Sequence, residues 1–242
     1  SPSCPGVWAP NVLTELACLS RIKDESSTTL PFAVTCDTDV MLYSELMSPV
    51  KPRSSCDAVL RDLIDDMKRL RSCGVVHMDI KPQNVMLDRD GKCRLIDFGM
   101  AAYTKCRRSQ YTDAEWQTRN MYTDEWVSCP HQQGTPAYMG LKRLNDVCDS
   151  LALWERDAVH AAAMCAVEIC KGRCLVPRGM SGVRTLDAKT RCCERWREWL
   201  QTGGMDAREF GIAGDRLEWR SRSLLRMLLE QANIQTAATM LR

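Results

Sequence analysis

Residues 77–84 read His-Met-Asp-Ile-Lys-Pro-Gln-Asn, and residues 97–99 read Asp-Phe-Gly. Together they place two carboxylates, an amide and an ammonium group on turns beside short apolar segments. The oxygens of Asn84 and Asp97 are hard ligands of the kind that Mg²⁺ prefers. Lys81 supplies a point charge for a phosphate, and Asp79 can orient or deprotonate a hydroxyl group. Phosphoryl transfer needs this combination, because its catalysis consists mostly of positioning and charge neutralisation.

These two motifs resemble the catalytic loop and the metal-binding triplet of eukaryotic-type serine/threonine protein kinases, with every position but one matched in order and spacing. The resemblance runs from about residue 11 to the end of the chain. It implies transfer of the γ-phosphoryl group of ATP to Ser or Thr hydroxyls of protein substrates. Asp79 and Lys81 would then be catalytic, and Asn84 and Asp97 would hold Mg²⁺.

The resemblance extends to the side of the site that would hold the nucleotide. Residues 42–47 resemble the hinge strand, where the backbones of Glu45 and Met47 would meet adenine. Met86 would form part of the adenine floor, and Glu15 resembles the glutamate of the N-lobe helix.

Other features of the sequence agree with the resemblance. Lys81 and Thr135 are both typical of the serine/threonine class rather than the tyrosine class. Asp157 resembles the buried aspartate that holds the backbone of the catalytic loop. His77 is interpreted as a packed scaffold residue rather than a base.

The chain departs from the family upstream of Glu15. Residues 1–14 contain no lysine, so we expect the first strands, the glycine-rich loop and the anchoring lysine to be absent from this chain. This departure leaves two alternatives to an active kinase. One is a pseudokinase that acts as a binding or decoy module for another kinase or its substrate. The other is that the chain is the C-terminal portion of a longer parent that carries the missing parts.

Two other departures concern the substrate side. Met78 replaces an arginine that normally pairs with a phosphorylated activation loop, so ordering by phosphorylation is not expected here. Residues 140–142 read Gly-Leu-Lys where the family has Ala-Pro-Glu, and Ile234 stands where the arginine partner of that glutamate would fall. Both members of that buried pair are missing together, which avoids an orphaned charge.

Composition excludes other classes of protein. Lys and Arg total 33 and Asp and Glu total 31, a net charge of +2 that is too balanced for an electrostatic nucleic-acid binder. The apolar run 158–167 is too short to span a bilayer. We therefore expect no membrane or nucleic-acid partner and an intracellular location, in the cytoplasm or nucleus.

The 14 cysteines form no C-x-x-C pair, which favours reduced thiols over a disulfide scaffold. Cys165, Cys170 and Cys174 fall on a helical pattern, where they are either a metal corner or buried residues that act as small apolar groups. His160 is interpreted as a satisfied core histidine. Residues 195–199 are interpreted as an amphipathic helix that buries two Trp, in preference to a base-stacking surface.

The pattern along the chain predicts an α+β fold: a protein-kinase-like fold with a reduced N-lobe, made of one helix plus a short hairpin, and a mainly α-helical C-lobe. The N-lobe and hinge would occupy residues 1–47, and the C-lobe would occupy 48–242 with a long activation segment at 97–139. Apolar periodicity predicts helices at 12–22, 58–72, 154–171, 187–201, 221–231 and 236–241. Short β-prone runs predict strands at 30–36, 40–47, 75–77, 85–87 and 93–96, with a turn at 37–39. Residues 99–136 appear irregular and polar.

Overall fold

The computed structural model describes residues 10–25, 32–36, 39–43, 47–50, 56–127, 134–145, 150–172, 174–176, 182–202 and 217–242. Its α-helices are α1 (Pro10–Glu25), α2 (Cys56–Ser72), α3 (Asp113–Thr118), α4 (Leu141–Asn145), α5 (Leu151–Lys171), α6 (Gly182–Thr202), α7 (Leu217–Leu228) and α8 (Ile234–Met240). Its strands are β1 (Phe32–Cys36), β2 (Asp39–Tyr43), β3 (Ser48–Pro49), β4 (Val75–Val76), β5 (Val85–Leu87), β6 (Cys93–Leu95), β7 (Ala102–Thr104) and β8 (Trp126–Val127). Short 3₁₀ turns lie at η1 (Pro82–Asn84), η2 (Arg108–Gln110) and η3 (Met121–Thr123).

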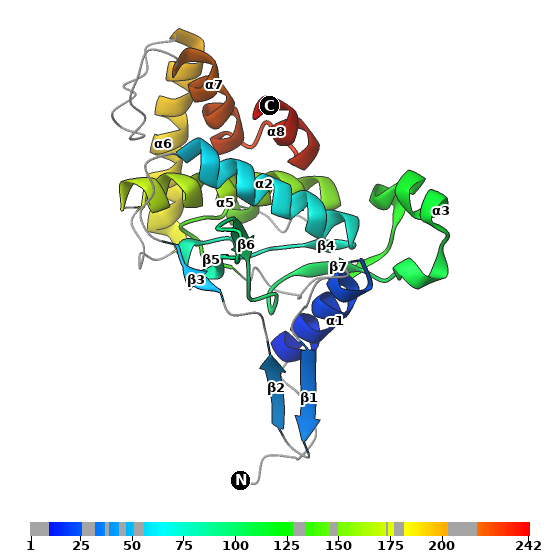
Figure 1. Cartoon of the computed structure of the whole chain (residues 1–242). Coiled ribbons are helices and arrows are strands. Elements are labelled where there is room, and N and C mark those ends of the chain that lie inside the picture. The colour runs from blue at the N-terminus through cyan, green and yellow to red at the C-terminus, as the bar shows by residue number, and fades with distance from the viewer. Residues whose placement is uncertain are drawn as a thin grey trace.

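The N-terminal part consists of α1 and an antiparallel β1–β2 pair that points away from the other elements (Figure 1). Cys36 lies opposite Asp39 in that pair, in agreement with the predicted hairpin, although turn residues 37 and 38 lie outside the described residues. Helix α1 joins the main core through the buried side chains of Cys18, Leu19 and Ile22. This part is the reduced N-lobe that the sequence predicts.

Helices build most of the C-lobe, with α5 at its centre. Nearly every residue of α5 is buried, and a helix that is apolar on all sides belongs inside a core. The left-handed Gly172, with φ of 70°, ends this helix. Figure 1 shows α2 lying along α5, with α7 and α8 on the side away from the strands and α6 running past one end of α5. The predicted helices of the C-lobe are thus confirmed.

Helix α2 also carries the small sheets that hold the site. Asp66 is fully buried on α2, and its carboxylate accepts a hydrogen bond from the Leu95 amide at 2.9 Å. One turn earlier, Asp62 accepts the Cys93 amide at 3.1 Å. These two carboxylates fix β6, which pairs with β5 in the antiparallel β3–β5–β6 sheet.

The expectation of an irregular segment at 99–136 is wrong for much of its length. The chain first forms β7, which joins β4 and β8 in a second antiparallel sheet. It then forms α3, where Thr112 and Glu115 make a capping box that supplies partners for amides at the start of the helix. Trp116 of α3 is buried, and its Nε1 donates to the Ser72 carbonyl at 2.9 Å. The segment is therefore a folded extension that docks on the end of α2.

Candidate active site

The β5–β6 hairpin brings the two sequence motifs together. Asn84 comes directly before β5, and Asp97 follows β6 by two residues. Val85 pairs with Leu95, and the Asn84 carbonyl accepts a hydrogen bond from the Ile96 amide at 3.0 Å. Asn84, at the end of the first motif, and Asp97, at the start of the second, therefore lie at the same end of this hairpin.

Asp79 lies at the centre of this site and is almost fully hydrogen-bonded. Its Oδ1 accepts from the amide and the hydroxyl of Thr135, at 2.8 and 2.9 Å. Its Oδ2 accepts from Lys81 Nζ at 2.5 Å, and its backbone carbonyl accepts from Asn84 Nδ2 at 2.9 Å. Burial alone would raise the pKa of the Asp79 carboxyl, but the hydrogen bonds from Lys81 and Thr135 outweigh it and lower the pKa. Asp79 is therefore a carboxylate at neutral pH.

Asn84 and Asp97 present the donor atoms that a hard divalent cation would need. The side-chain nitrogen of Asn84 donates to the Asp79 carbonyl, so the side-chain oxygen of Asn84 is directed away from that carbonyl. Asp97 is exposed and has a left-handed backbone with φ of 65°, a conformation that few non-glycine residues adopt and in which Asp is enriched. One carboxylate and one amide oxygen at the end of a hairpin fit Mg²⁺.

His77 is a scaffold residue in this geometry. Its Nδ1 accepts the Asp79 amide at 3.2 Å, so Nε2 carries the proton and donates to the Ile96 carbonyl at 3.0 Å. Burial lowers the pKa of the imidazole, which agrees with a neutral ring. The ring packs 5.4 Å from that of Phe98. His77 thus joins the catalytic loop to the residues around Asp97.

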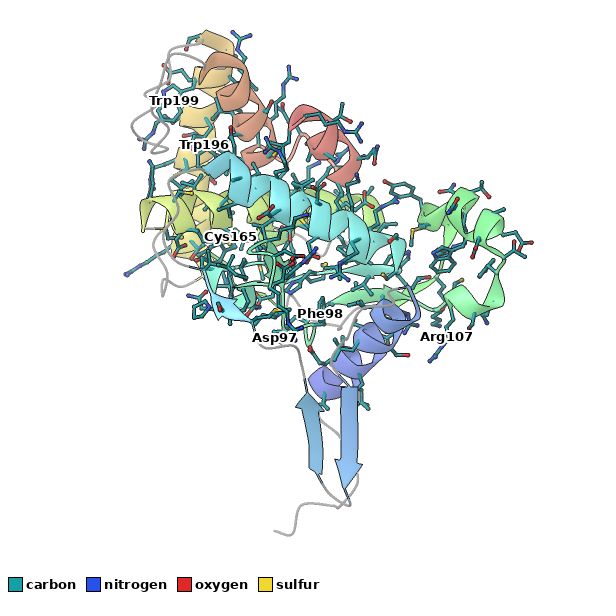
Figure 2. The ribbon with its side chains drawn as sticks, in the orientation of Figure 1. Asp97, Phe98, Arg107, Cys165, Trp196 and Trp199 are labelled. Atoms are coloured by element: carbon teal, nitrogen blue, oxygen red, sulfur yellow. The ribbon has the colours of Figure 1, made fainter. Side chains whose placement is uncertain are left out.

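Glu15 of α1 reaches the same place from the N-lobe. Burial, and then the charge of Asp97, raise the pKa of its carboxyl to about 7, while the Phe98 amide acts in the opposite direction. Its Oε2 is buried and has no hydrogen-bond partner within the described part of the chain. Figure 2 shows Asp97 and Phe98 beside α1. The helix glutamate therefore faces the metal-binding triplet.

The predicted adenine-side residues are placed only in part. Glu45 lies outside the described residues. Met47 directly precedes β3, where Pro49 pairs with Met86 of β5. The hinge side of the site and the expected adenine floor are thus adjacent through the β3–β5 pairing.

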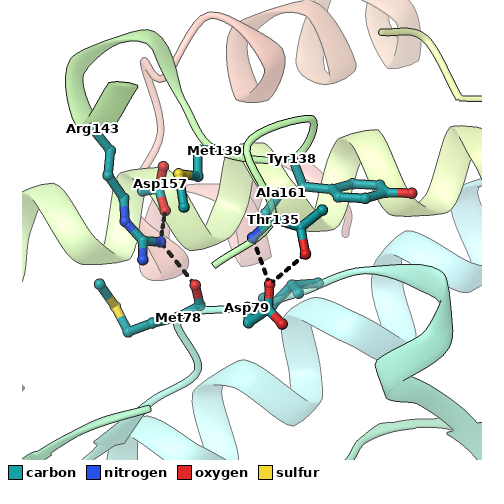
Figure 3. A pocket seen from close by; sticks show the side chains of 9 residues that line it. Met78, Asp79, Thr135, Tyr138, Met139, Arg143, Asp157 and Ala161 are labelled. Atoms are coloured by element: carbon teal, nitrogen blue, oxygen red, sulfur yellow. Dashed lines mark hydrogen bonds and ion pairs between the residues drawn. The ribbon is translucent and has the colours of Figure 1, made fainter. Parts of the chain in front are cut away.

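Arg143 supports residues 77–84 through a contact that the sequence reasoning missed. Its Nη1 donates to Asp157 Oδ2 at 2.7 Å and to the Met78 carbonyl at 2.8 Å (Figure 3). Asp157 therefore holds the catalytic loop through Arg143, while its Oδ1 accepts the Gly140 amide at 2.6 Å. These groups line a small pocket beside Asp79 and Thr135.

Arg21 attaches the chain that follows the Asp97–Gly99 triplet to α1. Met78 is buried and apolar, so it cannot pair with a phosphate as the arginine of the family does. Arg21 instead donates through Nε and Nη2 to the Thr104 carbonyl, at 3.1 and 2.8 Å, and its guanidinium lies 4.4 Å from the centre of the Tyr103 ring. Strand β7 is thereby held against α1.

Lys189 is a second residue that the sequence reasoning missed. It is fully buried on α6, and its Nζ donates to the Met139 carbonyl and lies 3.0 Å from His160 Nε2. His160 Nδ1 donates to the Leu228 carbonyl at 2.7 Å, which confirms the interpretation of a satisfied core histidine. Its burial shows only in the structure, where Lys189 shares the buried stripe of α6 with Thr185 and Cys193.

The buried Lys189 makes the stability of the protein depend on pH. Burial lowers the pKa of its ammonium to about 8, from an ordinary value of 10.5, although Asp157 and Glu230 act in the opposite direction. Below pH 8 the group is charged in both the native and the unfolded state. Between pH 8 and 10.5 the unfolded chain binds the extra proton, so the free energy of unfolding rises with pH. We expect the free energy of unfolding of wild type to rise by about 3 kcal/mol, relative to that of Lys189→Met, across this window.

Urea unfolding under reducing conditions, from pH 7 to 11, measures this difference. Burial raises the pKa of thiols such as Cys193, in that case to about 11. Their ionisation in the unfolded chain lowers the free energy of unfolding at high pH in both proteins, so this contribution largely cancels in the difference. Lys92→Met removes an exposed lysine and is the matched control, with no rise expected in that window. A difference between wild type and Lys189→Met that stays constant from pH 8 to 10.5 would contradict the assignment.

The other predicted clusters are structural. Cysteines in the described part of the chain, Cys165 among them, are free thiols, and these residues contain no group of three or more His, Cys, Asp or Glu side chains placed to hold a metal. Trp196 is buried and Trp199 packs on the core, both on α6 and far from Asp97 (Figure 2). Arg107, beside α3, is exposed. Within the described residues, no helix is both long and apolar enough to span a bilayer.

Known proteins with similar sequences are protein kinases. CBL-interacting protein kinase 4 of Oryza sativa subsp. japonica is 30% identical over 149 residues, which cover 50% of this chain and 33% of that protein. The chloroplastic serine/threonine-protein kinase STN8 of Arabidopsis thaliana is 24% identical over 150 residues, which cover 60% of this chain and 30% of that protein. Serine/threonine-protein kinase PKH3 of Saccharomyces cerevisiae is 52% identical over 40 residues, 16% of this chain and 4% of that protein. The chain thus spans a third or less of the length of these relatives.

The family model described as protein kinase domain matches residues 11–140, more than half of the chain. That range includes Glu15, the catalytic loop, the Asp97–Gly99 triplet and Thr135, which the fold brings to one site. The chain therefore belongs to the protein kinase family.

Proposed function

We propose that this chain is a serine/threonine protein kinase that transfers the γ-phosphoryl group of ATP to hydroxyl groups of protein substrates. The observation that carries the proposal is the set of contacts at Asp79, whose carboxylate accepts hydrogen bonds from both Lys81 and Thr135 and whose carbonyl accepts from Asn84, the residue before β5. Lys81 and Thr135 are the residues typical of the serine/threonine class, and the names of two of the relatives above also specify that class.

Each residue has a role that follows from its position. Asp79 remains ionised because its pKa is lowered, so it can accept the hydrogen bond and then the proton of the substrate hydroxyl. Lys81 is partly exposed beside it and neutralises charge on the phosphoryl group that moves. Asn84 and Asp97 would hold Mg²⁺, which neutralises phosphate charge when bound. Met47 and Met86, with Glu45, would contact adenine.

A pseudokinase that binds a partner without turnover is the second candidate. The buried Glu15 Oε2, which has no partner among the described residues, favours it, because an active kinase pairs this glutamate with a lysine that anchors the nucleotide. In that case the chain would capture another kinase or its substrate. The two candidates differ in whether bound nucleotide is turned over.

Nucleotide binding and turnover can be measured on the same preparation. We expect ATP with Mg²⁺ to raise the melting temperature, because a ligand that binds the native state stabilises it. We expect radiolabelled phosphate to appear on serine and threonine of casein or a basic protein substrate. Asp97→Asn is the sharpest control, since asparagine tolerates the left-handed backbone at this position while the carboxylate is lost.

The outcomes separate the candidates. In Asp97→Asn, both the Mg²⁺-dependent part of the melting shift and the transfer should be lost, with the melting temperature of the free protein unchanged. A melting shift without transfer in wild type would favour the pseudokinase. Transfer that is equal in wild type and Asp97→Asn would contradict the role given to Asp97.

A further inference from the structure

The segment from Thr135 to Leu141 links the substrate side of the site to the C-terminal helices. At one end, Thr135 donates twice to Asp79. At the other end, the Leu141 amide at the start of α4 donates to Glu230 Oε1 at 2.6 Å. Between them, Lys189 donates to the Met139 carbonyl. Groups from α6 and from the turn between α7 and α8 therefore hold the segment that covers Asp79.

Glu230 occupies a strained backbone position. Its φ of 57° lies in the left-handed region, where glycine is the favoured residue. This backbone lies just after α7, where the Glu230 and Gln231 amides donate to the Met227 and Arg226 carbonyls, and it directs the Glu230 side chain toward the Leu141 amide. That side chain is partly buried and points at α4, and burial raises the pKa of its carboxyl while the Leu141 and Lys142 amides act in the opposite direction.

Gly140 is matched to this carboxylate. A Cβ atom at residue 140 would lie 2.5 Å from Glu230 Cδ and 2.7 Å from each carboxylate oxygen. No side chain fits at that distance unless the carboxylate moves. The Gly140 amide donates to Asp157 at 2.6 Å, so the backbone here is held on two sides. Gly140 and Glu230, which are far apart in sequence, are therefore complementary in shape.

We propose that Glu230 is a positioning residue for the reaction, which holds the 135–141 segment so that Thr135 stays on Asp79. Its catalytic part rests on the function proposed above. Lys142 and Ile234 stand where related kinases have a glutamate and its arginine partner. Here the carboxylate of Glu230, from the C-terminal side, and the ammonium group of Lys189, from α6, each bond the backbone of the segment. The 135–141 segment is therefore still attached to the C-terminal helices, through Glu230 and Lys189.

Glu230→Gly tests this because it removes the carboxylate and relieves the strained backbone. We expect the melting temperature to stay close to that of wild type. The Leu141 and Lys142 amides should exchange hydrogen about tenfold faster, since a hydrogen-bond acceptor is lost. The KM for a protein substrate should rise about tenfold while the KM for ATP is unchanged, because only the substrate side is displaced. Glu230→Gln keeps one acceptor oxygen, so its increases in amide exchange and in the KM for the protein substrate should both be smaller than those of Glu230→Gly.

A double substitution tests the fit of the two residues. Gly140→Ala alone should accelerate exchange in residues 135–143 in wild type. In the Glu230→Gly background the same substitution should have less than about twofold effect, because the group it collides with is gone. Gln231→Ala, at the exposed neighbouring position, is the control that should change neither exchange nor KM.

Amide exchange tests the structural part of the proposal even if the protein transfers no phosphate. Unchanged exchange at Leu141 and Lys142 in Glu230→Gly would overturn the proposal whatever the activity. Faster exchange with an unchanged protein-substrate KM, in an active enzyme, would overturn the catalytic part alone. Equal effects of Gly140→Ala in both backgrounds would contradict the shape match. Absence of transfer in wild type would instead count against the proposed function.

Discussion

Replacing Asp79 with asparagine is expected to lower the rate of phosphoryl transfer by about 10²–10⁴-fold, the usual contribution of a general base. The amide can still accept one hydrogen bond, from Thr135 or from Lys81, so the loop should keep its conformation. It cannot accept a proton, and it does not carry the charge that Lys81 balances at 2.5 Å. The loss should therefore appear in kcat, with the KM for ATP little changed.

The measurement is initial-rate transfer of radiolabelled phosphate at saturating ATP and Mg²⁺. Asp90→Asn makes the same chemical change on the exposed turn of the β5–β6 hairpin and is expected to keep the wild-type rate. Thermal unfolding of all three proteins shows whether the fold is intact. Equal rates in wild type and Asp79→Asn would remove Asp79 from the mechanism and, with it, the proposed kinase activity.

The parts of the site that could be predicted from sequence are those that local structure assembles. Asp79, Lys81 and Asn84 lie within one loop, and a short hairpin returns the chain to Asp97. The spacing within these motifs therefore fixes most of the geometry once the hairpin forms. The folded extension around α3 was also signalled locally, by Thr112 and Glu115 in capping-box positions. It was missed because its helix and strands are too short for apolar periodicity to show.

The supports of the site could not be predicted, because they come from distant parts of the chain. Arg143 bonds the carbonyl of Met78, 65 residues earlier, and Lys189 bonds that of Met139, 50 residues earlier. Glu230 bonds the Leu141 amide across 89 residues. An arginine, a lysine and a glutamate are ordinarily surface residues. Only the packing of α4 on α6, and of α7 on α5 and α6, reveals their buried partners. The expectation that the family's buried ion pair is simply lost was incomplete for this reason.

The largest effect on stability is expected at Asp157. Asp157 and Arg143 are 5% and 8% exposed, and the ion pair between them is 2.7 Å long. Asp157→Leu would leave the guanidinium buried without its anion and the Gly140 amide without its acceptor. Removing one partner of a buried pair typically costs about 3–5 kcal/mol of unfolding free energy. Urea unfolding at pH 7 measures this loss.

The double variant Asp157→Leu/Arg143→Met decides whether the cost is that of an orphaned charge. With the guanidinium also removed, the double variant should be more stable than Asp157→Leu alone, since apolar replacement of a whole buried pair is often close to neutral. It should not regain phosphoryl transfer, because the Met78 carbonyl beside Asp79 no longer has the donor that fixes it. A double variant no more stable than the single one would mean that the cost lies in the packing of α5. Recovery of both stability and transfer would show that the catalytic loop holds its position without Arg143.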